Sequence, residues 1–337
     1  MCRVTILVTG VTGFLGSVLI RELIHNESFV GKDIRILAMP HENVDVLKKM
    51  GIDIFVGDLR DKNSLIGIMK DITTVYHNAA IIVNEAVSRE EMMLINYQGT
   101  VALAEGFLKE KAAEKFVFAS TLGVYGMKYP NYPVPESGPI KPANNYQESK
   151  YLAEKYLLDL AETNGINTSA IRNSLILGPG DTSTSPRLAR GLLDGKIPYL
   201  GKGTNRFSMV DARDSSRAMI LTTKKPNSKG EAYNVKSFDI NQKDYFDYYA
   251  EACNNCYPQK QYPYWLAYLF AWLKEKTTPK GQEALITRTR VKRYGSTRLL
   301  DTTKIEQTLG FKPKYTDPKI VIKDSIDWLC KNNYLAI

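Results

Sequence analysis

The chain has 337 residues, of which 44% are hydrophobic and 24% charged, as is typical of a globular protein with a sizeable core. No run of 18 apolar residues occurs, and Met1 leads at once into an apolar strand, so we expect neither a membrane span nor a signal peptide. The net charge of +9 comes from 45 Lys and Arg dispersed among 36 Asp and Glu. Without a recognisable nucleic-acid module, this surplus predicts a solvated surface, a crevice edge or anionic ligands.

The four cysteines are Cys2, Cys253, Cys256 and Cys330, too few to predict a disulfide framework in a chain of this length. Cys253-x-x-Cys256 stands alone, whereas a zinc site needs about four ligands. We therefore expect structural thiols, no metal and a reducing, cytoplasmic location.

Short apolar runs recur through the first half of the chain, and each precedes an amphipathic segment. The expected strands are residues 4–8, 34–38, 52–56, 74–77, 115–120 and 168–171. The expected helices are residues 17–23, one that opens at 40–43, 89–111 and 146–163. Repeated strand–helix units predict an α/β fold, a Rossmann-type doubly wound parallel sheet whose ligands lie beyond the carboxyl ends of the strands.

The regularity ends after Gly178-Pro-Gly-Asp181, and a smaller, mostly helical portion is expected to follow. The predicted helical segments there are residues 186–193, 211–223, 241–252 and 264–274, with a short extended piece at 233–235. We expect residues 1–172 to form a dinucleotide-binding domain, with elements near 205–235 returning to it, and residues 173–337 to form the substrate-binding portion. Residues 262–273 are the most apolar of this half, and a packed helix, a pocket wall or lid, and a membrane contact all remain open.

Three glycines follow the first strand as Gly10-x-x-Gly13-x-x-Gly16, one residue longer in the first interval than the G-x-G-x-x-G fingerprint. Glycine permits a sharp turn and the close approach of a ligand, and the N-terminus of the next helix offers free N–H groups to a pyrophosphate. The stretch predicts a nucleotide-binding turn.

Tyr146 and Lys150 lie four residues apart, so they share one face of the predicted helix. A neighbouring ammonium lowers the pKa of a phenol, which lets the tyrosine accept a proton from an alcohol or donate one to a carbonyl. Thr121 follows the strand at 115–120 and can hold the substrate oxygen. Two further pairs, Tyr151/Lys155 and Tyr315/Lys319, have the same spacing but do not start a helix after that strand.

Eight ordered motifs resemble the extended short-chain dehydrogenase/reductase superfamily (the NAD-dependent epimerase/dehydratase superfamily). Within it the chain is most similar to the 3-beta-hydroxysteroid dehydrogenase and dihydroflavonol reductase-like branch. The motifs are residues 9–16, 57–60, 77–80, 96–100, 120–126, Tyr146-x-x-x-Lys150, 172–180 and 309–313.

The resemblance implies an NAD(P)-dependent enzyme with Thr121, Tyr146 and Lys150 as its catalytic set. The residues that it implies for cofactor binding are Gly10, Gly13, Phe14, Leu15, Gly16, Asp58, Leu59, Asn78, Ala79, Ala80, Asn96, Tyr146, Lys150 and Asn173. Asn173 stands where relatives usually have proline. The resemblance also implies a homodimer, in which the helices at 89–111 and 146–163 pair across a two-fold axis.

Ala38 and Met39 end the second strand, where NAD users usually carry an acid that binds the ribose 2′-hydroxyl. Without a carboxylate there, and with His41 nearby, we expect NADP or NAD with a slight preference for NADP.

The motif Val210-Asp-Ala-Arg-Asp214 and the aromatic segment at 262–273 resemble the hydroxysteroid dehydrogenase and dihydroflavonol reductase-like branch. This resemblance implies an oxidoreductase that interconverts an alcohol and a ketone or aldehyde on an apolar small molecule. A nucleotide-sugar epimerase or dehydratase with tightly bound NAD is the alternative, because Val124-Tyr125-Gly126 is common among sugar enzymes. A cofactor-binding protein without catalysis is a third possibility, which the intact Thr121, Tyr146 and Lys150 set disfavours.

Overall fold

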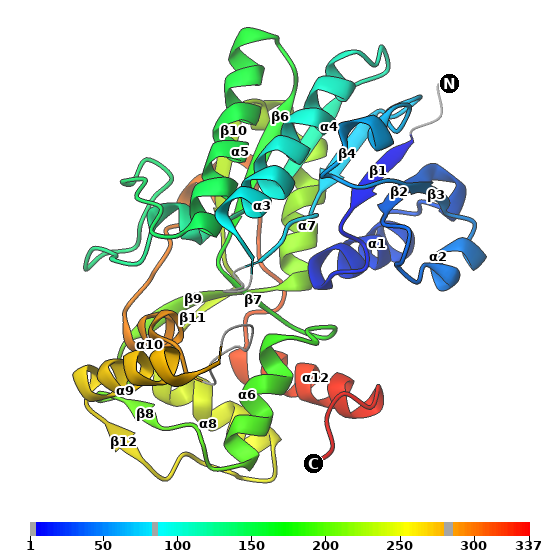
Figure 1. Ribbon diagram of the computed structural model, residues 1–337. Coiled ribbons are helices and arrows are strands. Elements are labelled where there is room, and N and C mark those ends of the chain that lie inside the picture. The colour runs from blue at the N-terminus through cyan, green and yellow to red at the C-terminus, as the bar shows by residue number, and fades with distance from the viewer. Residues whose placement is uncertain (1–4, 83–86, 280–285) are drawn as a thin grey trace.

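A seven-stranded parallel sheet forms the centre of the larger lobe (Figure 1). The structure is a computed structural model, and it describes residues 5–82, 87–279 and 286–337. The strand order is β10-β6-β5-β4-β1-β2-β3, and every neighbouring pair is parallel. The strands are β1 (Ile6–Thr9), β2 (Ile34–Ala38), β3 (Asp53–Val56), β4 (Thr74–His77), β5 (Lys115–Thr121), β6 (Thr168–Asn173) and β10 (Glu231–Val235).

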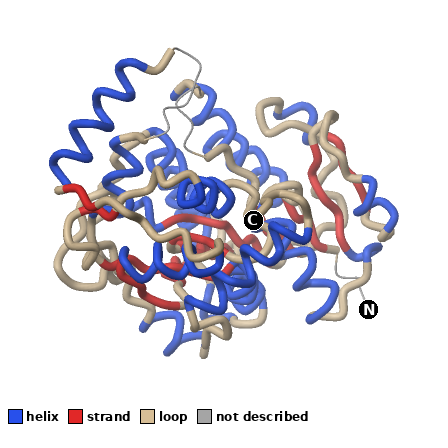
Figure 2. Tube along the Cα trace, turned by 90° about the horizontal axis from the view of Figure 1, so that it is seen from below, coloured by secondary structure: helices blue, strands red, loops and turns tan. Residues whose placement is uncertain are grey.

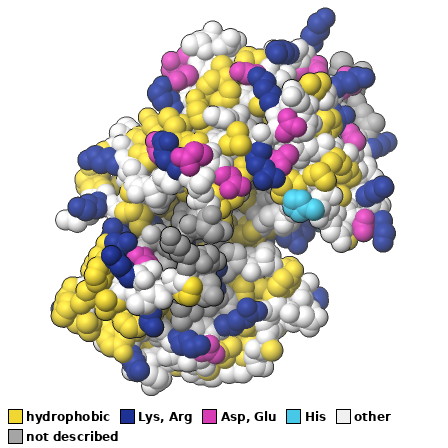
Figure 3. All heavy atoms as spheres, in the orientation of Figure 1, with side chains coloured by type: hydrophobic (Ala, Val, Ile, Leu, Met, Phe, Trp, Pro, Cys, Tyr) yellow, Lys and Arg dark blue, Asp and Glu magenta, His cyan; other side chains and the backbone are white. Residues whose placement is uncertain are grey.

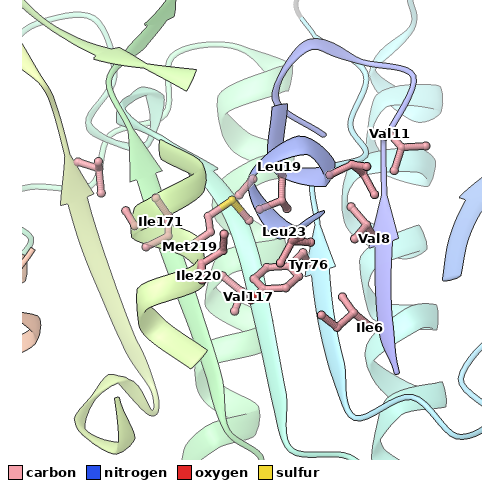
Figure 4. Close-up of a cluster of buried hydrophobic side chains, with 14 of the residues drawn as sticks. Ile6, Val8, Val11, Leu19, Leu23, Tyr76, Val117, Ile171, Met219 and Ile220 are labelled. Atoms are coloured by element: carbon pink, nitrogen blue, oxygen red, sulfur yellow. The ribbon is translucent and has the colours of Figure 1, made fainter. Parts of the chain in front are cut away.

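Helices cover both faces of this sheet, because its central strands carry apolar side chains on each side. On one face Leu19 and Leu23 of α1 (Phe14–Asn26) and Met219 of α7 (Ala212–Thr223) pack against strand residues that include Val8 and Ile171 (Figure 4). Helices α4 (Gly99–Leu108) and α5 (Asn145–Thr163) supply the apolar residues that cover the other face. The predicted fold class, a Rossmann-type doubly wound parallel sheet, is confirmed.

The helices alternate with these strands and continue into the second lobe. Their bounds are α1 (Phe14–Asn26), α2 (Asp45–Lys49), α3 (Arg89–Met93), α4 (Gly99–Leu108), α5 (Asn145–Thr163), α6 (Thr184–Leu193), α7 (Ala212–Thr223), α8 (Gln242–Ala252), α9 (Tyr264–Thr277), α10 (Arg288–Gly295), α11 (Thr303–Leu309) and α12 (Pro318–Lys331). In the view from below, helices form most of the periphery (Figure 2). No helix in the described ranges is both long and apolar enough to cross a bilayer.

The smaller lobe has two short sheets of its own. Strands β7 (Leu175–Leu177), β9 (Arg206–Asp211) and β11 (Phe238–Asn241) form one, and β8 (Tyr199–Leu200) pairs with β12 (Gln261–Tyr262) in the other. The chain returns to the large sheet through α7 and β10, whereas β9 lies in the smaller lobe. Helix α11 also packs on the large sheet, which no sequence pattern predicted.

The helix expected over 89–111 is divided into three parts. A π-helical segment, η3 (Leu94–Gln98), separates α3 from α4, and the helix ends at Leu108. The helix expected to open at 40–43 begins only at Asp45. Thr121 is the last residue of β5 rather than the first residue beyond it. A π segment widens the helix by one residue, and such segments often lie at functional sites.

Candidate active site

The glycine turn brings β1 and α1 against the end of β4. Gly10 has a φ of 71°, and a Cβ there would lie 2.6 Å from the backbone nitrogen of Ala79. A Cβ on Gly16 would lie 2.2 Å from the Gly10 carbonyl oxygen. The Gly13 N–H donates to the Gly10 carbonyl at 3.1 Å and closes the turn. Side chains at Gly10 and Gly16 would therefore force the turn apart.

His77 ties the turn to the neighbouring strand end. Its Nδ1 lies 2.7 Å from the Thr9 hydroxyl oxygen, and its Nε2 lies 2.8 Å from that of Thr100. The Thr9 oxygen also accepts from the Ala79 N–H at 3.1 Å. Complete burial lowers the pKa of His77 to about 3, with a further contribution from Lys150, so the imidazole is neutral. His77 therefore orders the backbone that the glycine turn touches.

Asn78 carries an unsatisfied amide beside this turn. Neither its Oδ1 nor its Nδ2 has a hydrogen-bond partner in the described part of the chain, although both atoms are buried. Leaving such groups unpaired costs on the order of 1–3 kcal/mol each, so an external partner is expected. The orphaned amide, the glycine cradle and the N-terminus of α1 together fit a dinucleotide.

Thr121 and Tyr146 meet in a cavity of about 700 Å³ between the two lobes. The Thr121 oxygen accepts from the Gly123 N–H at 3.0 Å, so its own proton is free to be donated. Its side chain hydrogen-bonds the Tyr146 hydroxyl. Asn144 caps α5 by accepting from the Gln147 N–H at 2.9 Å, which fixes Tyr146 in the first turn.

Lys150 lies one turn further along α5 and is only 2% exposed. Its ammonium nitrogen sits 3.8 Å from the centroid of the Phe118 ring. Burial lowers the pKa of Lys150 to about 7, against the opposing effect of Glu154. Burial also raises the pKa of Tyr146, while the hydrogen bond from Thr121 opposes that rise. The pKa of Lys150 is thus brought near neutrality, whereas that of Tyr146 is moved further from it, and a positive charge placed beside the phenol would lower its pKa again.

Asn96 lies in η3 and positions two segments of the site. Its Oδ1 accepts from the Ile81 N–H at 2.8 Å, and its Nδ2 donates to the Ile81 carbonyl at 3.0 Å. The same Nδ2 donates to Ser149 at 3.0 Å, and Ser149 donates to the Tyr146 carbonyl. Asn96 therefore joins the segment after β4 to the helix of Tyr146.

Four arginines line the cavity that holds Thr121 and Tyr146: Arg187, Arg290, Arg293 and Arg298. Arg298 is 5% exposed, and in the described structure its Nε is buried without a partner. Burial and the nearby Arg293 lower the pKa of Arg298 to about 10. The cluster at 288–293, which the sequence allowed as a crevice edge, thus reaches the site and makes this wall of the cavity charged rather than apolar.

A model of the NAD dependent epimerase/dehydratase family matches residues 6–235, two thirds of the chain. The chain belongs to the NAD dependent epimerase/dehydratase family. It is 26% identical over 338 residues to a putative dihydroflavonol 4-reductase of Synechocystis sp., covering 97% of this chain and 95% of that protein. It is 29% identical over 347 residues to a putative UDP-glucose 4-epimerase of Methanocaldococcus jannaschii, covering 97% and 99%.

Two solved structures share the fold of this family member. A UDP-glucose 4-epimerase of Thermotoga maritima, solved with UDP-glucose, superposes with a TM-score of 0.77 at 22% identity, covering 98% of this chain and 99% of that one. A dTDP-glucose 4,6-dehydratase of Streptomyces venezuelae, solved with NAD, superposes with a TM-score of 0.76 at 21% identity, covering 98% of each. Membership of this family identifies the chain as an enzyme that depends on a nicotinamide dinucleotide.

The other cofactor residues predicted for this epimerase/dehydratase family member lie in varied surroundings. Asp58 forms a fork with Arg60, whose hydrogen bonds lower the pKa of the carboxyl. Leu59 is buried against Gly99 at the start of α4. Asn173 lines the cavity, and its Oδ1 accepts from Ser215 at 2.6 Å. Phe14 and Leu15 begin α1, and Ala79 and Ala80 follow the end of β4.

Glu42 is a functional candidate that the sequence pattern missed. Its carboxylate accepts from the Met39 N–H at 2.8 Å, at the carboxyl end of β2, and also from the Thr12 hydroxyl in the glycine turn. From the sequence we expected no carboxylate here, because Glu42 lies three residues beyond Met39, where the second strand ends and NAD users usually carry an acid. An acid shortly after the second strand is the only signal that could have identified it.

The remaining residues that the sequence singled out lie in surroundings that indicate a structural role. Burial raises the pKa of the Cys253 thiol to about 12, and no group of three His, Cys, Asp or Glu within residues 5–82, 87–279 and 286–337 could hold a metal. Asp214 accepts from the backbone of Lys314 and Tyr315, so the motif at 210–214 joins the lobes. Tyr315 itself stacks under Arg213.

Proposed function

We propose that the chain oxidises a secondary alcohol on a substrate that carries a phosphate or diphosphate, as in nucleotide-sugar epimerisation or dehydration. The observation that supports this proposal most strongly is the buried guanidinium of Arg298, whose Nε has no partner in the described structure. Arg298 lines the same cavity as Arg293, Thr121 and Tyr146. A buried guanidinium is costly to leave unpaired, and its planar donors suit phosphate oxygens.

In this proposal Tyr146 exchanges a proton with the substrate oxygen, and Thr121 donates a hydrogen bond that holds the oxygen in place. Lys150 favours the phenolate of Tyr146 from one turn away. A bound nicotinamide supplies the hydride acceptor and a positive charge. The glycine turn and the Asn78 amide would hold this dinucleotide.

Replacing Arg293 tests the anionic substrate. We expect Arg293→Met to raise KM for a nucleotide sugar by about 10- to 100-fold, because a charge-assisted hydrogen bond is lost. The dissociation constant of the dinucleotide should stay unchanged. Arg206→Met is the matched control, since Arg206 is exposed on β9 and does not line the cavity. Equal KM values in the two variants would contradict the proposal.

Glu42 leads us to propose NAD rather than NADP, the reverse of the slight preference drawn from Ala38 and Met39. A carboxylate beside the glycine turn repels a 2′-phosphate and can accept from a ribose 2′-hydroxyl. We expect Glu42→Gln to improve the affinity for NADP relative to NAD by about tenfold, measured by calorimetric titration. Asp45→Asn, an exposed change at the start of α2, should leave the ratio at its original value. An unchanged ratio in Glu42→Gln would exclude this role.

A net dehydrogenase of an apolar alcohol is the second candidate, since Leu175, Ile176 and Met209 also line the cavity. The two reactions differ in their cofactor balance. Incubation with NADH or NADPH and apolar ketones should consume the cofactor stoichiometrically only for a dehydrogenase. With UDP-sugars, isomerisation at constant cofactor absorbance would support the first proposal, and cofactor loss with ketones alone would support the second.

A further inference from the structure

Helix α9 exposes its large apolar side chains and buries its small ones. Ala267 and Ala271 are the residues of α9 that are buried in the structure. Trp265 is 67% exposed, and five further large apolar residues of the helix are also exposed. These six define the α9 face: Trp265, Leu266, Leu269, Phe270, Trp272 and Leu273. The helix is packed through Ala267 and Ala271, as one of the alternatives from the sequence allowed, but its large apolar side chains are exposed.

The α9 face is continuous. At 3.6 residues per turn its six side chains occupy an arc of about 160°, whereas Ala267 and Ala271 point to the opposite side. Figure 3 shows the hydrophobic side chains gathered where Figure 1 places α9, and in Figures 1 and 2 the helix lies at the periphery. A patch of this kind marks a surface that meets an apolar partner.

The charges around the α9 face are mostly positive. Lys274 and Lys276 follow it, with their ammonium nitrogens 5.5 Å and 5.3 Å from the ring centroids of Phe270 and Trp272. Lys292 of the adjoining α10 lies 5.5 Å from the centroid of Tyr268. The acid of α9, Glu275, is neutralised by Arg288. The border of the apolar face therefore complements anions.

We propose that the α9 face docks on a lipid bilayer that carries anionic headgroups. Tryptophan and leucine side chains enter the headgroup and acyl boundary, while the lysines remain at the level of the phosphates. Helix α9 has 14 residues, about 21 Å, which suits a helix lying in the interface rather than one crossing a core of about 30 Å.

A bilayer explains the α9 face better than a second copy of the chain does. Cores of protein interfaces are depleted in lysine, whereas interfacial helices combine exposed tryptophan with lysine. The two-fold face predicted for a homodimer involves α4 and α5, which lie at the other end of the molecule (Figure 1). Docking through α9 would also bring α10, with Arg290 and Arg293 of the cavity, next to the bilayer.

Vesicle binding of the full chain tests this proposal. We expect cosedimentation with vesicles of phosphatidylcholine and phosphatidylglycerol, and less with phosphatidylcholine alone or at high salt. The double variant Trp265→Ser, Phe270→Ser should bind about tenfold or more weakly. Ile66→Ser with Val46→Ser is the matched control, because both residues are apolar and highly exposed but lie in the other lobe, and its binding should equal that of the parent.

Tryptophan emission gives a second readout. Two of the three tryptophans, Trp265 and Trp272, lie on the α9 face, so their emission should shift to the blue and be quenched by brominated acyl chains. Failure of the parent protein to bind anionic vesicles would overturn the proposal. Vesicle binding by Trp265→Ser, Phe270→Ser that equals that of the parent would also overturn it. The same holds if the parent protein binds no vesicles but forms an oligomer that this double variant dissociates.

Discussion

Replacing Tyr146 by Phe is expected to reduce turnover by about 10²- to 10⁴-fold, because the substrate oxygen loses its proton donor and acceptor. The dinucleotide should still bind, since the glycine turn and Asn78 remain intact. The Tyr146 hydroxyl is hydrogen-bonded to Thr121 and faces the cavity, so its removal changes little in the core. Steady-state kinetics and calorimetric titration of the dinucleotide would measure the two effects separately.

Tyr151→Phe is the matched control for this experiment. Tyr151 lies on the same helix and shares the Tyr-x-x-x-Lys spacing with Lys155, but it packs beside Val124 and Tyr125 outside the cavity lining. Loss of the Tyr151 hydroxyl should leave turnover unchanged. Full activity in Tyr146→Phe would show that another group carries the proton and would remove the basis of the proposed chemistry.

Replacing Gly10 by Ala is expected to have the largest effect on stability and on dinucleotide binding together. The left-handed backbone costs an alanine about 1–2 kcal/mol, and the Cβ would also lie 2.6 Å from the Ala79 nitrogen. Relief of that contact adds about 1–3 kcal/mol and moves the end of β4, which carries Asn78. We therefore expect a loss of about 2–5 kcal/mol in the free energy of unfolding and a dinucleotide affinity at least about tenfold lower.

A substitution at Gly51 separates the cost of the left-handed backbone from the cost of the steric contact. Its φ of 76° matches that of Gly10, but nothing lies within 4 Å of a Cβ there. Gly51→Ala should therefore lose only the conformational part, about 1–2 kcal/mol, and should bind the dinucleotide as the parent does. Urea unfolding and dinucleotide titration provide both measurements. Equal losses in the two variants would show that the contact between Gly10 and Ala79 has no energetic consequence.

Much of the larger lobe could be predicted from local patterns. The expected strands at 34–38 and 74–77 agree with β2 and β4, because a buried parallel strand is a short apolar run bounded by turn residues. The Gly10, Gly13 and Gly16 spacing predicts a turn for a steric reason that the structure bears out. The π segment at Leu94–Gln98 could not be predicted, since its extra residue leaves the apolar spacing nearly helical.

The candidate site was predicted in part. Tyr146 and Lys150 share a helix face by spacing alone, and the structure brings Thr121 to Tyr146. Their chemical roles stay predictions, as do the domain boundary at 172 and the homodimer. Glu42 and Arg298 were missed because each reaches its place through contacts with residues far away in the chain. Glu42 meets Thr12 across the glycine turn, and Arg298 enters the cavity from the smaller lobe.

The sequence by itself determined the alternation of strands and helices in the first half of the chain, the glycine turn and the face that Tyr146 shares with Lys150. These follow from steric limits and from helix and strand periods, which act over a few residues. Only the tertiary structure decided that large side chains of α9 stay exposed and that four arginines converge on one cavity. Periodicity shows which side chains share a face, but long-range packing decides what, if anything, covers that face.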